Sequence, residues 1–209
     1  MTGTDVNAIG YIAQGLFSAR FIVQWISSEK AGKVVAPTLF WQISLIASFL
    51  LVVYSILTKD ITILGGQMIG YYIYVRNLRL QEAWRILPLY FRLFVLIVPI
   101  GAVLTLLFGG QYSFLSMMGN HQNIWLLAWG LTGQAIFSCR FIYQWYYSEK
   151  VKKSVLPLGF WLISIIGSIL ISSYSIYLEF YPIFIGHLFG MVVYSRNVVL
   201  YYKSRRRKK

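Results

Sequence analysis

The sequence predicts an all-α polytopic membrane protein in which seven transmembrane helices form a 3+1+3 parallel tandem repeat. Three observations predict it: an apolar composition, seven long apolar segments and an internal duplication. Hydrophobic residues make up 58% of the 209 residues and charged residues 12%, with a mean hydropathy of +0.64. A soluble domain carries about 25% charged residues. So few charges cannot cover a soluble globular surface, which excludes a soluble enzyme.

Seven apolar segments, each long enough to cross a bilayer at about 18 residues or more, define the predicted helices. They lie at residues 7–27, 38–58, 61–80, 88–108, 124–146, 157–178 and 182–200. The first segment is expected to be a membrane helix and not a cleaved signal peptide, because no Lys or Arg precedes it and Arg20 and Gln24 lie inside it. The lone Cys139 permits no intrachain disulfide.

Basic residues gather on one side of the predicted helices. Nearly all follow the first, third and fifth helices or lie in the C-terminal tail, whereas the opposite side offers only Lys59. The positive-inside rule therefore predicts an inner-membrane protein with an external N-terminus and a cytoplasmic C-terminus. A net charge of +13 would favour nucleic-acid binding in a soluble protein. Here it is explained by topology, with weak attraction of the tail to anionic lipid headgroups, and we expect no nucleic-acid partner.

The chain contains an ungapped duplication, in which residues 10–80 align with residues 130–200 with about thirty identities. Identical pairs include Gln14/Gln134, Phe17/Phe137, Arg20/Arg140, Gln24/Gln144, Glu29/Glu149, Phe40/Phe160, Trp41/Trp161, Gly66/Gly186, Gly70/Gly190, Tyr74/Tyr194, Arg76/Arg196 and Asn77/Asn197. Each copy has an odd number of spans, so the unmatched span at 88–108 restores a parallel orientation. The predicted parts are a first repeat (1–80), a linker with the fourth transmembrane helix (81–123), a second repeat (124–200) and a basic cytoplasmic tail (201–209).

These paired motifs resemble the lipid A biosynthesis N-terminal domain family, within the wider PQ-loop and SWEET-like group. The resemblance rests on the run Gln14–Lys30, on Pro37 with Phe40 and Trp41, and on the ending Tyr74-Val75-Arg76-Asn77, and it covers both copies. It implies a membrane module associated with glycolipid assembly, in a family sometimes joined to a lipid A disaccharide synthase. The chain departs from that pattern because it lacks a glycosyltransferase domain and has no Pro-Gln pair in its first helix.

Parallel repeats related by an axis along the membrane normal are a transporter architecture, with the site between the repeats. We therefore expect the two copies to pack around a pseudo-two-fold axis, with the first helices lining one cleft. Arg20 lies eight residues before Ser28, so it sits about 12 Å inside its helix, and Arg140 is equally deep. Either these arginines face the bundle interior, or they snorkel to the headgroups.

The other candidate substrate-binding residues are polar side chains near the cytoplasmic ends of the helices. One turn from the arginines, Gln24 and Gln144 complete a guanidinium-and-amide pair suited to an anion, or they bond neighbouring helices. The third helices contribute the Arg-Asn pairs Arg76, Asn77, Arg196 and Asn197. We expect Asn77 to share a stripe with Gly66, Gly70 and Tyr74, and Arg76 to point elsewhere.

Further residues in the second and third helices admit simpler interpretations. His187, where the first copy has Gln67, is a candidate ligand-binding residue or a hydrogen-bonded interior histidine. The GxxxG spacing of Gly66 and Gly70 is typical of close helix packing. The helix-starting aromatic residues, Phe40, Trp41, Phe160 and Trp161, are expected to form an interfacial belt.

The sequence offers little for enzymatic chemistry, because it holds six carboxylates and no nucleophile elbow, zinc spacing or phosphate loop. Glu29 and Glu149 precede lysines and are expected to neutralise their own loops. We therefore predict that the chain is not an enzyme and has no catalytic residues, cofactor or metal.

The predicted function is a membrane carrier or flippase for a lipid-linked or phosphate-bearing sugar, such as a polyprenyl-phosphate-linked sugar, in envelope glycolipid assembly. Membrane lipids and a glycosyltransferase are the expected partners. Two alternatives stay open: a SWEET-like small-solute transporter, and a non-transporting scaffold for a glycosyltransferase.

Overall fold

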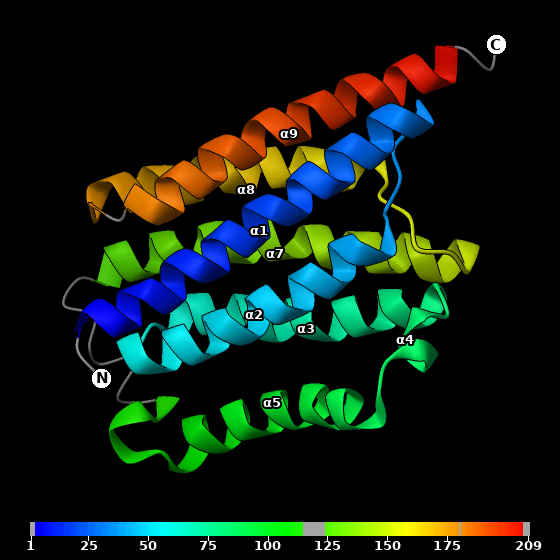
Figure 1. Ribbon diagram of the computed structural model, residues 1–209. Coiled ribbons are helices and arrows are strands. Elements are labelled where there is room, and N and C mark those ends of the chain that lie inside the picture. Colours follow the sequence, from blue (N-terminus) through cyan, green and yellow to red (C-terminus); the bar gives the residue numbers. More distant parts are fainter. Residues whose placement is uncertain (1–2, 115–123, 180, 207–209) are drawn as a thin grey trace.

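The computed structural model describes residues 3–114, 124–179 and 181–206 (Figure 1). These residues are helical almost throughout. The long helices are α1 (Gly3–Ala31), α2 (Thr38–Thr58), α3 (Ile61–Leu80), α5 (Leu89–Phe108), α7 (Ile124–Val151), α8 (Leu158–Tyr177) and α9 (Tyr181–Arg206). A single turn, α4 (Ala83–Ile86), precedes α5, and a 3₁₀ turn, η1 (Gly110–Tyr112), follows it. Part of the predicted linker, residues 115–123, lies outside the described residues.

Five of the described helices are long and apolar enough to cross a membrane. They are α2, α5, α8 and the segments Val6–Ala31 of α1 and Ile183–Arg206 of α9. This composition supports a membrane protein. Helices α3 and α7 lie where the sequence predicts them, but they do not meet the same measure of apolarity. Their crossing of the membrane, and with it the seven-span arrangement, stays a prediction.

Six of the long helices form a closed ring. Going round it, α1 packs on α2, α2 on α3, α3 on α7, α7 on α8, α8 on α9, and α9 back on α1. Figure 1 shows α9 and α1 running side by side, while α5 lies at the edge of the bundle. Two of these contacts join the copies, α3–α7 and α9–α1, and they are equivalent when the copies are exchanged. Helix α5 contacts α2 from outside the ring.

The core of the ring is an aromatic cluster built from matching residues of both copies. Trp41, Trp161, Phe40 and Phe160 are each 0% exposed, so the predicted interfacial belt is wrong for these four side chains. Each tryptophan packs against a tyrosine of its own copy, with ring centroids 6.1 Å apart for Trp41–Tyr74 and 6.0 Å apart for Trp161–Tyr194. Burial of large aromatic rings outweighs an interfacial position here.

Candidate functional site

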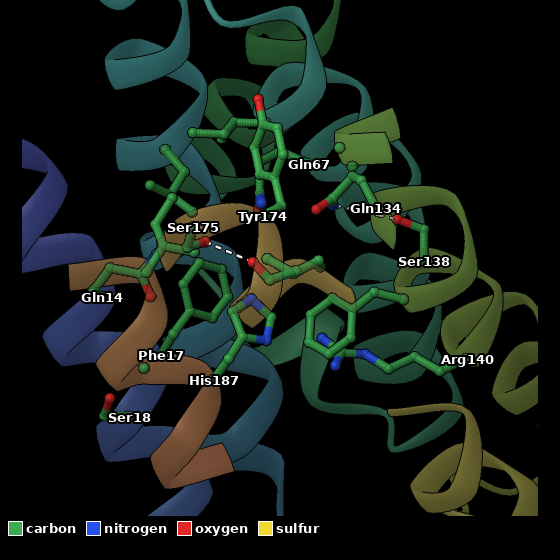
Figure 2. Close-up of a pocket in the computed structure, with 18 of the residues that line it drawn as sticks. Gln14, Phe17, Ser18, Gln67, Gln134, Ser138, Arg140, Tyr174, Ser175 and His187 are labelled. Carbon is green, nitrogen blue, oxygen red and sulfur yellow. Dashed lines mark hydrogen bonds between the residues drawn. The ribbon is translucent and has the colours of Figure 1, made fainter. Parts of the chain in front are cut away.

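A central cavity of about 160 Å³ lies between the two copies (Figure 2). Its polar lining comprises Gln14, Ser18, Arg20, Asp60, Gln67, Tyr74, Gln134, Ser138, Arg140, Tyr174, Ser175, His187 and Tyr194. A second cavity of about 180 Å³ shares Gln14, Leu51, Ile63 and Ile183 with it and reaches Asn7 and Glu179. The open space therefore extends from the arginines toward the N-terminal end of α1.

Both deep arginines face the bundle interior, because each is only 2% exposed and lines the cavity. Snorkelling is thus not the arrangement observed. Arg20 donates from Nη1 to Ser44 Oγ at 2.8 Å and to the Tyr74 hydroxyl at 3.3 Å. Arg140 donates from Nη1 to the Tyr194 hydroxyl at 3.4 Å. The Nε atom of each arginine is buried without a hydrogen-bond partner among the described residues.

The charges of these arginines are offset by aromatic rings and not by carboxylates. The guanidinium carbon of Arg20 lies 4.3 Å from the ring centre of Phe17, and that of Arg140 lies 3.2 Å from the ring centre of Phe137. Within the described part of the chain, neither arginine forms a salt bridge. Cation–π contacts stabilise such a charge by about 2 kcal/mol when it is desolvated, much less than burial of the charge costs. These contacts therefore offset the buried charges of the two arginines only in part.

The predicted glutamines bind the other copy of the repeat. Gln24 and Asn197 form two hydrogen bonds, from Gln24 Nε2 to Asn197 Oδ1 at 2.8 Å and from Asn197 Nδ2 to Gln24 Oε1 at 3.0 Å. Gln144 and Asn77 form the same pair with distances of 2.8 and 3.0 Å. All four side chains are 0% exposed. We call these two pairs the amide clamps.

Two ion pairs lie beside the amide clamps and also join the copies. Arg76 binds Glu149 through both Nε and Nη2, with the Nη2–Oε2 distance at 2.8 Å. Arg196 binds Glu29 in the same way, at 2.5 and 3.1 Å. The Arg76 guanidinium lowers the pKa of the Glu149 carboxyl, which lies beyond the predicted span, to about 2. The expected neutralisation within the loop is seen for Glu149, which pairs with Lys152, but the sequence did not predict that both glutamates also bind an arginine of the other copy.

The third helix of each copy faces the first helix of the other. Asn77 lies on the expected stripe toward α7, but Arg76 also reaches α7, because its long side chain bends to Glu149. A methyl group at Gly66 would overlap the Gln134 amide, and one at Gly70 would lie 2.9 Å from the Tyr74 hydroxyl. These glycines therefore make room for polar side chains of the cavity and not for a neighbouring backbone.

The structure thus separates the predicted binding residues into two groups. Arg20, Arg140 and His187 line the cavity. The remaining six belong to the amide clamps and ion pairs, namely Gln24, Gln144, Asn77, Asn197, Arg76 and Arg196. A substrate-binding role for these six stays a prediction. Sequence reasoning missed Gln14 and Gln134, although their identity at matching positions is a signal that could have found them.

Position 67 and its counterpart 187 carry different polar side chains in the cavity, Gln67 and His187. Gln67 Oε1 accepts a hydrogen bond from Ser48 at 2.9 Å, and His187 Nδ1 lies 3.0 Å from Ser168 Oγ. Each serine thereby orients the cavity side chain of its own copy. In the described residues no cluster of three or more His, Cys, Asp or Glu side chains could hold a metal ion.

The fold and cavity together define a class of protein: a duplicated helical membrane bundle with an arginine-lined cavity between its copies. The chain belongs to the Lipid A Biosynthesis N-terminal domain family, whose profile matches residues 9–79 and 129–199. No solved structure matches the chain significantly, so the wider PQ-loop and SWEET-like resemblance stays a prediction.

Curated relatives extend this finding. The chain is 30% identical over 208 residues to the lipid-A-disaccharide synthase of Chlamydia pneumoniae and 29% identical over 209 residues to that of Chlamydia felis. It is also 30% identical over 171 residues to the enzyme of Chlamydia muridarum. The first two alignments cover 95% of this chain but only 34% and 33% of the relatives. The chain thus spans about a third of their length.

These relatives contradict the prediction that the chain is not an enzyme, because proteins that match 95% of it carry an enzyme's name. That prediction relied on missing catalytic motifs. The matched stretch is about a third of the length of each relative. The absence of catalytic motifs from this stretch therefore does not exclude such motifs elsewhere in proteins of this kind.

Proposed function

We propose that this protein takes part in lipid A assembly by binding the phosphate of an anionic glycolipid in the central cavity and carrying it between leaflets. The single observation that supports the proposal is the pair of buried arginines without a salt bridge. Guanidinium groups bind phosphate oxygens with a planar fork of donors, and both arginines line the cavity while their buried Nε atoms have no hydrogen-bond partner. One doubly charged phosphate between them would offset both charges.

The closed end of the cavity supports a carrier role. The amide clamps and ion pairs lie beyond the arginines, toward the predicted cytoplasmic ends of the helices, and they tie the copies together there. The opposite end leads into the second cavity. Opening one end while closing the other requires only that the copies rock against each other, as in other repeat-built transporters.

The names of the relatives favour a related second role. They are synthases of the lipid A disaccharide, and they are about three times as long as the region matched here. In that role this bundle would hold a phosphorylated lipid for a synthase active site. Both roles require the same phosphate site, and a transport assay with reconstituted protein distinguishes them.

The phosphate site is tested with Arg20→Gln, Arg140→Gln and the corresponding Lys variants. Purified proteins are incubated with a monophosphorylated diacylglucosamine and with its dephosphorylated form, and bound lipid is measured by native mass spectrometry. Hydrogen bonds to a charged group are worth about 1.5–3 kcal/mol, so each Gln variant should bind the phosphorylated lipid about 10-fold or more weakly. Lys should restore binding only in part, because it lacks the fork.

The matched control is Arg85→Gln, because Arg85 is an exposed arginine on α4 away from the cavity. It should bind both lipids like the unaltered protein. Equal retention of the phosphorylated lipid by all arginine variants, or equal retention of both lipids by the unaltered protein, would refute the phosphate site.

A further inference from the structure

The part of the cavity beyond the arginines is rich in neutral hydrogen-bonding groups. Gln14 and Gln134 lie six residues before Arg20 and Arg140, which separates their Cα atoms from those of the arginines by about 9 Å along the helix axis. Figure 2 shows both amides, Gln67, His187 and several hydroxyls directed around one space. Amide side chains donate and accept hydrogen bonds at once. Such groups match a ligand that carries several hydroxyls.

The amide side chains of Gln14 on α1 and Gln134 on α7 each lie against a glycine of the other copy. Gln134 lies against Gly66, where any side chain would overlap its Nε2 atom, and Gln14 Oε1 lies 3.2 Å from a methyl group placed at Gly186. Each amide therefore lies where a larger residue at the facing glycine would displace it. Within the described residues, the only hydrogen bond of the Gln134 side chain is a long one to Ser138 at 3.5 Å, and Gln14 has none. Both amides can thus bond a ligand.

Gln67 and His187 occupy equivalent positions in the two copies, and a serine orients each of them. One polar atom of each side chain is thereby left for the cavity. Ser48 donates to Gln67 Oε1, which leaves the Nε2 amide hydrogens as donors. Ser168 contacts His187 Nδ1, which leaves Nε2. The two sides of this part of the cavity therefore carry different polar groups. A ring with different substituents on its two edges would bind there in one orientation.

We infer that Gln14, Gln67, Gln134 and His187 form a sugar subsite, which holds one hexose ring while the arginines hold the phosphate attached to it. The inference rests on the proposed phosphate site. A volume of about 160 Å³ is close to that of a cavity that accepts benzene, so there is room for about one ring. Acyl chains or a second ring would lie outside it.

The subsite is tested by comparing two soluble probes, glucose 1-phosphate and methyl phosphate, by isothermal titration calorimetry on the full chain in detergent. The unaltered protein should bind glucose 1-phosphate at least 10-fold more tightly. Gln14→Leu, Gln134→Leu and Gln67→Leu keep the side-chain size and remove hydrogen bonds. Each should lower affinity for glucose 1-phosphate by about 3- to 10-fold and leave methyl phosphate unchanged. Gln42→Leu is the control, because Gln42 does not line the cavity.

The ratio of the two affinities is measured within each variant, so partial loss of folded protein does not affect it. Equal affinities in the unaltered protein, or a ratio unchanged in all three leucine variants, would overturn the sugar subsite while the phosphate site stands. If Arg20→Gln and Arg140→Gln bind both probes normally, the phosphate site fails, and the subsite that rests on it is overturned too.

Discussion

The amide clamps predict a specific pattern of energetic coupling between the two copies. Replacing Gln24 with Leu leaves Asn197 Oδ1 buried without its partner and removes a hydrogen bond to Ser28. A buried polar group without a partner costs about 1–3 kcal/mol, so the free energy of unfolding should fall by about 2–3 kcal/mol. Asn197→Leu should cost a similar amount. The double variant should cost little more than either single variant, which corresponds to a coupling energy of about 2 kcal/mol.

The control cycle combines Gln24→Leu with Asn77→Leu. These residues belong to different clamps and share no hydrogen-bond partner, so their effects should add within about 0.5 kcal/mol. The assay is unfolding of purified protein in mixed micelles with increasing SDS. Strong coupling of Gln24 to Asn77, with none to Asn197, would show that the clamps form within each copy. That result would refute the pairing of Gln24 with Asn197 of the other copy.

Two further substitutions test details of the site. Gly66→Ala should displace the Gln134 amide and lower the affinity for glucose 1-phosphate about as much as Gln134→Leu does. The control is Gly65→Ala, because a methyl group at Gly65 would have no atom within 4 Å, and it should not change the affinity in the same titration. Val34→Thr should raise the free energy of unfolding by about 1 kcal/mol in the SDS assay, because its hydroxyl can pair with the buried, unpartnered Trp161 Nε1; no stabilisation would refute this placement.

The two copies differ in the hydrogen-bond partner of their buried tryptophan. Trp41 Nε1 donates to Ser154 Oγ at 2.9 Å, and that serine in turn donates to Asn77 Oδ1 at 2.7 Å. Exchanging the copies turns Ser154 into Val34, which has no hydroxyl. Trp161 consequently lacks the partner that Trp41 has. Threonine nearly preserves the shape of valine, so the new hydrogen bond costs little packing.

The positions of the helices follow closely from the sequence, because each apolar segment is long and bounded by polar residues. The ends differ: α7 continues to Val151 and α9 to Arg206, beyond the predicted 146 and 200. Hydropathy marks only the apolar part of a helix, whereas backbone hydrogen bonds continue into the polar region. The duplication was likewise evident from sequence, and it accounts for the matching contacts at α3–α7 and α9–α1.

The partners of the polar side chains could not be predicted, for a reason inherent to duplicated chains. Helical spacing places Gln24 and Asn77 on defined faces of their helices, but the second copy offers Gln144 and Asn197 with the same spacing. Pairing within a copy and pairing between copies are therefore equally consistent with the sequence. Only the ring order of the helices, in which α1 packs along α9 and α3 packs along α7, selects the pairs between copies.

The distribution of identical and different residues within the cavity is informative about the ligand. A phosphate has nearly equivalent oxygens, so it can lie on an axis relating two identical arginines, and Arg20 and Arg140 are identical. A sugar ring has no such symmetry, so a site that binds it in one orientation needs different groups on its two sides. The cavity residues differ at Gln67 and His187, beyond the arginines and beside the amides. Making these two positions alike, as in His187→Gln, should therefore reduce the preference for glucose 1-phosphate over methyl phosphate, while methyl phosphate binding, which depends on the arginines, stays the same.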